Sequence, residues 1–144
     1  MTRITFLHGA RHRLQAMAGW LARRYASGTL PIVVYAPDRG QGELLDRLLW
    51  TQAATGFIPH CRLGGPLAPE TPILIADTLD QAPADACLLN LSNEIPNGFA
   101  RFPELVEIVS IEDEDKLPGR DRFRFYRERG YPLENQDISG GLPA

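Results

Sequence analysis

The sequence lacks any excess of basic residues. Its 144 residues carry 15 lysines and arginines against 18 aspartates and glutamates, giving a net charge of −3, and Lys116 is the only lysine. Proteins that bind nucleic acid over a whole face normally need a broad basic surface. The composition therefore argues against such a face, and we expect any role on DNA to be exercised through partner proteins.

Long apolar runs are also missing. No stretch approaches the roughly 20 apolar residues that a membrane-spanning helix needs, and the apolar part of the N-terminal MTRITFLHGA is too short for a secretory signal. Hydrophobic residues make up 44% of the chain and charged residues 23%, which is ordinary for a globular domain. We expect a cytoplasmic protein that does not contact a membrane.

Cysteine is scarce, and its spacing excludes two further classes of protein. Cys61 and Cys87 lie in separate apolar segments without a close-spaced partner, which is typical of reduced, buried thiols and not of a disulfide framework or a zinc site. The three histidines add no ligand spacing. We therefore expect neither a metal nor a cofactor.

Short apolar segments alternate with helical patterns along most of the chain. Residues 2–8 and 30–36 read as buried strands, each followed by a helical pattern, at 11–25 and from Gly42 onward. Shorter apolar pieces follow at 57–63, 73–76 and 86–91, then a last strand at 105–111 and a charged helix from about 115 to 130. Gly64 to Pro72 reads as the most mobile loop.

This order predicts a three-layer α/β fold. Its largely parallel sheet would be flanked by helices in a Rossmann-like arrangement without a nucleotide-binding loop. We expect a single domain over residues 1–133 and a disordered tail over 134–144, because the tail has two glycines and few apolar side chains.

A glycine pair keeps one enzymatic alternative open. Gly40 and Gly42 follow a strand and open a helix, where dinucleotide-binding proteins carry a glycine loop. The third glycine of that loop is absent, with Leu45 in its place, and no phosphate loop with a Gly-Lys-Ser/Thr ending occurs. A small nucleotide-dependent enzyme using the Gly40/Gly42 turn therefore remains only the alternative hypothesis.

The acidic run Glu112 to Asp115 also has two interpretations. Acidic residues before a helix stabilise its positive N-terminal end, and we favour this role over metal binding. No Ser/His/Asp set, Cys/His pair or HExxH spacing can be assembled. We expect no catalytic centre.

Two stretches could bind a partner. Trp50 ends a leucine-rich helix and Phe57 follows a short turn, so the two rings either complete the core or form an exposed apolar contact. On the C-terminal helix, 3.6 residues per turn brings a basic surface around one aromatic ring. This surface suits an acidic peptide with an apolar anchor, or it is a solvated, salt-bridged helix. It consists of Lys116, Arg120, Phe123, Arg124 and Arg127.

The residues around Trp50 resemble a known family. Leu49-Trp50, a polar turn from Thr51 to Gly56, and Phe57-Ile58-Pro59-His60 match the corresponding part of the chi subunits of bacterial DNA polymerase III. A second match lies between Val106 and Gly130. Two matches in the same order make the sequence similar to that family over most of its length.

The resemblance implies a non-catalytic accessory subunit of the replicative polymerase with two binding surfaces. Trp50 and Phe57 would bind the small clamp-loader subunit psi. A second set would bind the C-terminal tail of single-stranded DNA-binding protein, an acidic peptide that ends in Pro-Phe with a free carboxylate. This second set is Val109, Lys116, Arg120, Phe123 and Arg124.

The sequence departs from the family pattern at two places in this second surface. Phe123 stands where some members have tyrosine, which removes a hydroxyl contact but keeps the ring. Pro118-Gly119 replaces the helix-favouring residues of some members, which leaves the start of the helix open.

Overall fold

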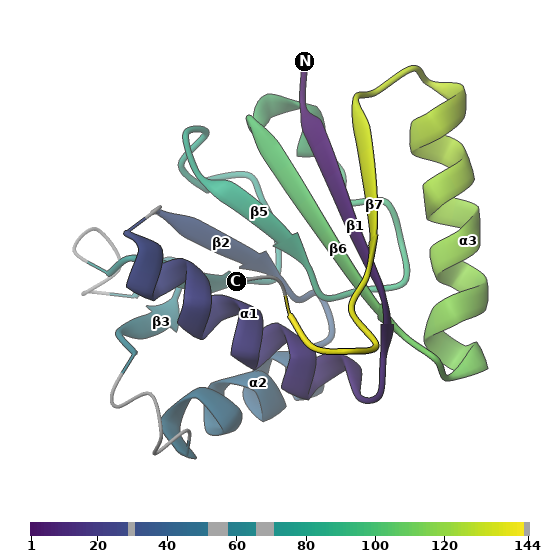
Figure 1. The fold of residues 1–144 in the computed structure, drawn as a ribbon. Coiled ribbons are helices and arrows are strands. Elements are labelled where there is room, and N and C mark those ends of the chain that lie inside the picture. Colours follow the sequence, from purple (N-terminus) through teal and green to yellow (C-terminus); the bar gives the residue numbers. More distant parts are fainter. Residues whose placement is uncertain (29–30, 52–57, 66–70, 143–144) are drawn as a thin grey trace.

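A seven-stranded sheet forms the middle layer of the molecule (Figure 1). A computed structural model of the chain describes residues 1–28, 31–51, 58–65 and 71–142. The strand order is β3-β4-β2-β5-β6-β1-β7, and all neighbouring strands run parallel. The strands are β1 (Arg3–Ala10), β2 (Ile32–Tyr35), β3 (His60–Arg62), β4 (Ile73–Ala76), β5 (Cys87–Asn90), β6 (Glu104–Ser110) and β7 (Leu133–Asp137).

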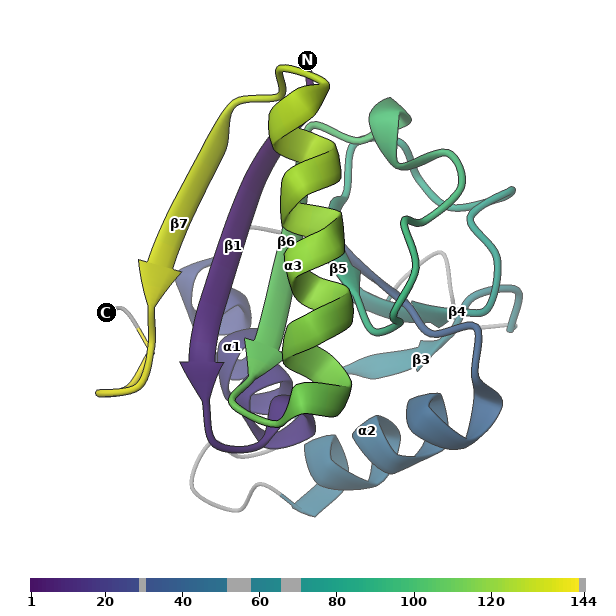
Figure 2. The ribbon, with the colours of Figure 1, turned by 90° about the vertical axis from the view of Figure 1, so that its right-hand side faces the viewer.

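Helices cover both faces of the sheet, which confirms the predicted three-layer α/β fold. Helices α1 (Arg13–Ser27) and α2 (Arg39–Thr51) cover one face, and α3 (Asp113–Glu128) covers the other (Figures 1 and 2). Two separate hydrophobic clusters fill the spaces between the layers, one against α1 and α2 and one against α3. Among the described residues, no helix has the length and apolar character to span a bilayer.

Central strands are apolar on both sides because helices lie above and below them. β2 and β4 read IVVY and ILIA and are buried at every position. β6 is likewise buried along its whole length, although it contains Glu104 and Glu107. Two carboxylates in a buried central strand each require a partner.

The C-terminal segment corrects one prediction. Residues 134–144 were expected to be disordered, but residues 133–137 form β7, which pairs with β1 from Ile4↔Leu133 to His8↔Asp137. Ile138 is then buried, and Leu142 packs against the α1 side of the core. The prediction of disorder was based on the small number of apolar residues. An edge strand needs few of them, because it is held mainly by backbone hydrogen bonds. Residues 143–144 lie outside the described part of the chain.

Smaller differences concern element boundaries. The third predicted strand, at 57–63, shortens to His60–Arg62, and Phe57 lies outside the described residues. The predicted mobile loop at 64–72 lies largely outside them as well. Helix α3 begins at Asp113, so the acidic run occupies its N-cap and first turn, as the favoured interpretation predicted.

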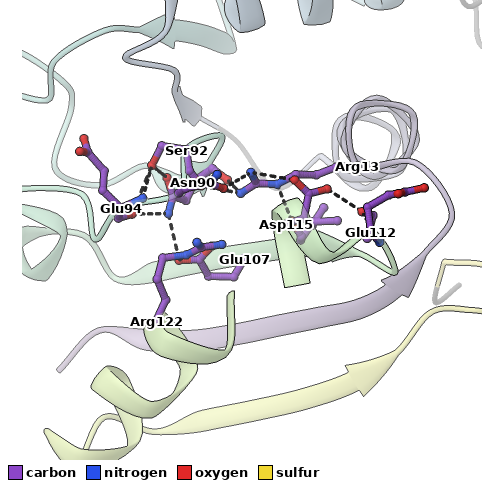
Figure 3. A network of polar contacts seen from close by, with 11 residues as sticks. Arg13, Asn90, Ser92, Glu94, Glu107, Glu112, Asp115 and Arg122 are labelled. Atoms are coloured by element: carbon purple, nitrogen blue, oxygen red, sulfur yellow. Dashed lines mark hydrogen bonds and ion pairs between the residues drawn. The ribbon is translucent and has the colours of Figure 1, made fainter. Parts of the chain in front are cut away.

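Glu107 is the centre of a buried polar network that joins α3 to the sheet. Its side chain is fully buried, and its Oε2 accepts hydrogen bonds from Tyr126 Oη at 2.7 Å, Asn90 Nδ2 at 3.0 Å and Arg122 Nε at 3.1 Å. Figure 3 shows the part of this network formed by Asn90, Glu107 and Arg122. Burial, followed by the nearby Glu107 carboxylate, raises the pKa of Tyr126 above its usual range. Two residues of α3 are thus fixed to one strand.

Replacing Glu107 with leucine should lower the free energy of unfolding by about 3 to 5 kcal/mol. The substitution leaves the Arg122 guanidinium buried without its counter-charge, which is the costly way to break a buried pair. Urea denaturation measures the change. The double variant Glu107→Leu/Arg122→Leu should be more stable than the single one, and a double variant that is further destabilised would contradict this account.

Candidate functional site

A groove of about 510 Å³ lies between α3, β1 and β7, which we call the α3 groove. Helix α3 supplies one wall, and the strands supply the floor and the opposite wall. The lining residues are Lys116, Arg120, Phe123, Arg124 and Arg127 from α3, Phe6, His8 and Gly9 from β1, Val109, Ser110 and Ile111 from the end of β6, and Asn135 from β7.

All five residues predicted for the tail-binding surface line this one groove. Four of them lie on the helix at spacings that place them on one side of α3, as the helical period required. The fifth, Val109, lies on β6 beneath the helix. Arg127, which the sequence placed on the same helical face, also lines the groove.

Apart from Val109, sequence reasoning missed the strand residues of the groove. Phe6 packs edge-on against Phe123, with ring centroids 5.4 Å apart, and forms the floor under the helix. The alternation of β1 carried a usable signal, because Ile4 and Phe6 share a face with His8. Asn135 could not be found, because its segment was predicted to be disordered.

The four cations of the groove differ in how they are paired. Lys116 Nζ lies 3.7 Å from Asp113 Oδ1, and Arg124 Nη1 lies 3.6 Å from Asp121 Oδ1. Within the described part of the chain, neither Arg120 nor Arg127 has an ion-pair partner. Arg127 instead lies over the Phe123 ring, 5.8 Å from its centroid. The groove therefore presents two arginines that form no ion pair with the described residues.

Gly119 fixes how closely α3 approaches the groove floor. A Cβ atom at Gly119 would lie 2.7 Å from Val109 Cγ1, closer than side chains tolerate. Val109 is buried in β6 and β-branched, so it cannot turn away at low cost. The glycine that departs from the family pattern thus brings the helix directly onto Val109.

A second candidate surface surrounds Trp50 at the end of α2. The indole is 62% exposed, so it is not the core residue that the alternative interpretation required. Its ring lies edge-on to His60, with centroids 5.6 Å apart, and His60 Nε2 lies 2.8 Å from Asp46 Oδ1. Whether Phe57 lies beside Trp50, as predicted, falls outside the described residues.

A larger cavity of about 720 Å³ opens at the carboxyl ends of the strands. Open parallel sheets usually bind ligands at this edge. Here the side chain of Arg13 lies along the strand ends and forms part of the cavity lining, and Figure 3 shows its polar contacts. Its Nε donates to Ile108 O at 2.8 Å, its Nη2 to Ser92 O at 2.7 Å and Asn90 O at 3.3 Å, and its Nη1 to Asn93 Oδ1 at 3.1 Å.

The Gly40/Gly42 turn is also occupied by the protein itself. The Asp38 carboxylate accepts hydrogen bonds from the backbone N–H groups of Gly40 at 2.9 Å and Gln41 at 3.3 Å. These donors at the start of α2 are the ones that a phosphate would use, and a phosphate would meet a carboxylate there. The Asp38 carboxylate at this turn therefore disfavours the nucleotide-dependent alternative.

The described residues contain no cluster of three or more histidine, cysteine or acidic side chains that could hold a metal ion. Both cysteines are free thiols, and Cys87 is buried. Burial, with the nearby Glu104 carboxylate, raises the pKa of Cys87 above its usual range. The side chains that converge on the two candidate surfaces are cationic and aromatic, a combination suited to binding a protein segment.

Comparison with known proteins identifies the family of this chain. A model described as DNA polymerase III chi subunit, HolC, matches residues 1–134. The chain belongs to this chi subunit family. The family resemblance read from the residues around Trp50 and α3 is thereby confirmed.

Chi subunits from three organisms are similar to the chain over most of its length. DNA polymerase III subunit chi of Pseudomonas aeruginosa is 31% identical over 128 residues, which cover 88% of this chain and 87% of the relative. The Escherichia coli subunit is 29% identical, covering 78% of this chain and 76% of its own length. The Haemophilus influenzae subunit is 26% identical, with 74% and 75% covered.

Replacing Gly119 with alanine should destabilise this chi-family protein by about 1 to 3 kcal/mol. Alanine normally stabilises a helix interior by up to about 1 kcal/mol relative to glycine, but here the added methyl group would overpack against Val109. Urea denaturation shows whether the substitution raises or lowers the free energy of unfolding. When Val109 is also replaced by alanine, adding Gly119→Ala should cost much less stability than it does in the wild-type protein.

Gly42→Ala provides the matched control. Gly42 is a buried helical glycine whose added Cβ would lie no closer than 3.4 Å to Ala36 Cβ and Ile75 Cγ2. We expect this variant to be far less destabilised than Gly119→Ala. Equal losses at both positions would mean that Val109 is not what limits the approach of α3.

Proposed function

We propose that this chi-family protein is a non-catalytic, cytoplasmic subunit that links the clamp loader of DNA polymerase III to single-stranded DNA-binding protein during replication. In this proposal the α3 groove binds the acidic C-terminal tail of single-stranded DNA-binding protein, and the Trp50 surface binds the psi subunit. The protein contacts DNA only through these partners.

The observation that carries the proposal is the α3 groove. A net charge of −3 makes a surface with four converging cations exceptional on this protein. The cations surround an apolar floor, so the groove matches a peptide that combines carboxylates with an aromatic side chain. Arg120 lies in the groove with no ion pair to the described residues, so its charge is available to a ligand.

Arg120 and Lys116 are the groups proposed to hold the carboxylates of the tail. Arginine suits this role because its planar guanidinium can give two parallel hydrogen bonds to one carboxylate, a geometry that lysine cannot reproduce. Phe123 and Val109 would contact the terminal phenylalanine, and Arg124 would add long-range attraction. Phe6, which supports the Phe123 ring, would keep this contact rigid.

The Trp50 surface is proposed as the psi-binding surface. Large exposed aromatics are typical anchors of protein interfaces, and Trp50 is one of the most exposed large apolar side chains of the described residues. Phe57 is proposed as the second aromatic anchor of this surface.

Two separate surfaces explain how such a subunit could act without catalysis. Binding one partner raises the local concentration of the other, so neither site needs high affinity alone. The clamp loader would thereby be held near DNA that is coated with single-stranded DNA-binding protein.

Arg120→Ala should weaken binding of the tail peptide by about 2 kcal/mol, or some thirtyfold. This is the low end of the loss expected when one partner of a hydrogen-bonded charge pair is removed, because Arg120 is exposed. Arg120→Lys should already weaken binding. Calorimetric titration measures both, with a synthetic tail peptide that is intact, amidated at its C-terminus, or lacking its final phenylalanine.

Wild-type protein should prefer the intact peptide, and Arg120→Ala should largely lose this preference while its stability is unchanged. Arg129→Ala is the matched control, because Arg129 is an exposed arginine at the C-cap of α3 that lies over the Phe125 ring and does not line the groove. If all three peptides bind wild-type protein equally, the helix is only a solvated charged surface.

Trp50→Ala should reduce the affinity for psi by at least about 2 kcal/mol and change the free energy of unfolding by less than about 1 kcal/mol, because the indole is largely exposed. Surface plasmon resonance with purified psi and urea denaturation measure the two effects. Trp20→Ala is the contrasting variant. Trp20 is buried, so its loss should cost about 3 to 5 kcal/mol of stability. A Trp50→Ala variant that loses stability on that scale would make this ring structural.

A further inference from the structure

The α3 groove carries a positive charge at each of two points along its length. Arg120 and Arg127 are two helical turns apart, so their backbones are separated by about 10 Å along the axis of α3. Both line the groove, and neither has an ion-pair partner among the described residues. The groove therefore offers two separate binding points for negative charge.

An aromatic contact separates these two points. Phe123 lies between Arg120 and Arg127 in the helix and packs edge-on against Phe6 of β1. Arg127 lies over the Phe123 ring, which holds its guanidinium against the groove wall. This arrangement keeps the second charge beside the groove, although Arg127 is an exposed residue.

The strand side of the groove adds polar groups without adding negative charge. Asn135 of β7 lies level with Phe6 in the sheet, near the C-terminal half of α3, and His8 lies further along β1. None of the residues that line the groove is acidic. A carboxylate could therefore approach either end without meeting a fixed charge of its own sign in the lining.

We propose that the groove binds an acidic C-terminal peptide at two points at once. Arg120 receives the terminal carboxylate, and Arg127 receives a side-chain carboxylate three residues before it. This inference rests on the proposed function of the groove and adds Arg127 as a residue that determines specificity. The groove then recognises the position of an acidic residue in the peptide, and not only its total charge.

The spacing follows from the dimensions of the two chains. An extended peptide advances about 3.3 to 3.6 Å per residue, so three residues span the distance of about 10 Å between Arg120 and Arg127. Lys116 and Arg124 are less suited to reading position, because Asp113 and Asp121 already partly neutralise them. They add attraction that depends little on where the peptide carries its charges.

A double-mutant cycle tests the pairing. The probes are synthetic peptides that end in Pro-Phe with a free carboxylate. One carries a single aspartate three residues before the terminal phenylalanine, one carries asparagine there, and one carries the aspartate six residues before the end. Each is titrated calorimetrically into the full-length protein, as wild type, Arg127→Gln and the control Arg129→Gln.

Wild-type protein should bind the peptide with the aspartate at the third position about fourfold more tightly than the asparagine peptide at low salt, the scale of an exposed charge pair. Arg127→Gln should abolish this preference, whereas Arg129→Gln should keep it. The preference should shrink at high salt, because the pair is exposed to solvent.

Two outcomes separate this inference from the proposed function. If Arg127→Gln keeps the full preference, or if wild type prefers the aspartate at the sixth position equally, the two-point reading is wrong, although the groove still binds the tail. If Arg120→Ala has no effect and amidation of the peptide is tolerated, the tail-binding function itself fails.

Discussion

The buried carboxylate of Glu107 determines where the α3 groove can lie. It lies in the middle of a central strand and draws both Arg122 and Tyr126 of α3 onto the sheet. These residues occupy the inner side of the helix, so the side that carries Arg120 and Arg127 turns toward β1 and β7. Gly119 then lets the helix come down onto Val109. A charge pair and a missing methyl group together set the orientation and the depth of the groove.

The helical half of the groove could be predicted from sequence, whereas on the strand side only Val109 was predicted, through the family resemblance. Helical periodicity alone places Lys116, Arg120 and Phe123 together, because residues three and four apart share a face. Asn135 belongs to a strand with few apolar residues. Its position depends on backbone pairing with β1, which no local sequence pattern predicts. The sheet with helices on both faces could be predicted, because strands such as β2 are apolar at every position. The exposure of Trp50 depends on how α2 packs, which its sequence left open.

The two candidate surfaces lie on different layers of the molecule. Trp50 ends α2, which covers one face of the sheet, whereas the α3 groove opens on the other face (Figure 2). The α3 groove shares only Ser110 of its lining with the strand-end cavity, where Arg13 donates to the carbonyl groups of Ser92, after β5, and Ile108, in β6. The edge that serves enzymes of similar architecture as a ligand site is therefore used here to hold strands together. The two proposed binding surfaces lie instead on the helical layers, so in that proposal one partner could be bound without blocking the other.

The position of β1 in the sheet has a consequence for how the chain acquires its structure during synthesis. Among the described strands β1 comes first in the chain, yet its two neighbours are β6 and β7, which come last. Arg3 therefore cannot pair with Glu104, nor Ile4 with Leu133, until those later segments have been synthesised. Pairings between such distant segments form slowly, because a long loop must close before any contact repays its entropy. Until β6 and β7 have been synthesised, the nascent β1 has neither of its partner strands. The groove floor is therefore among the last parts of the protein to mature.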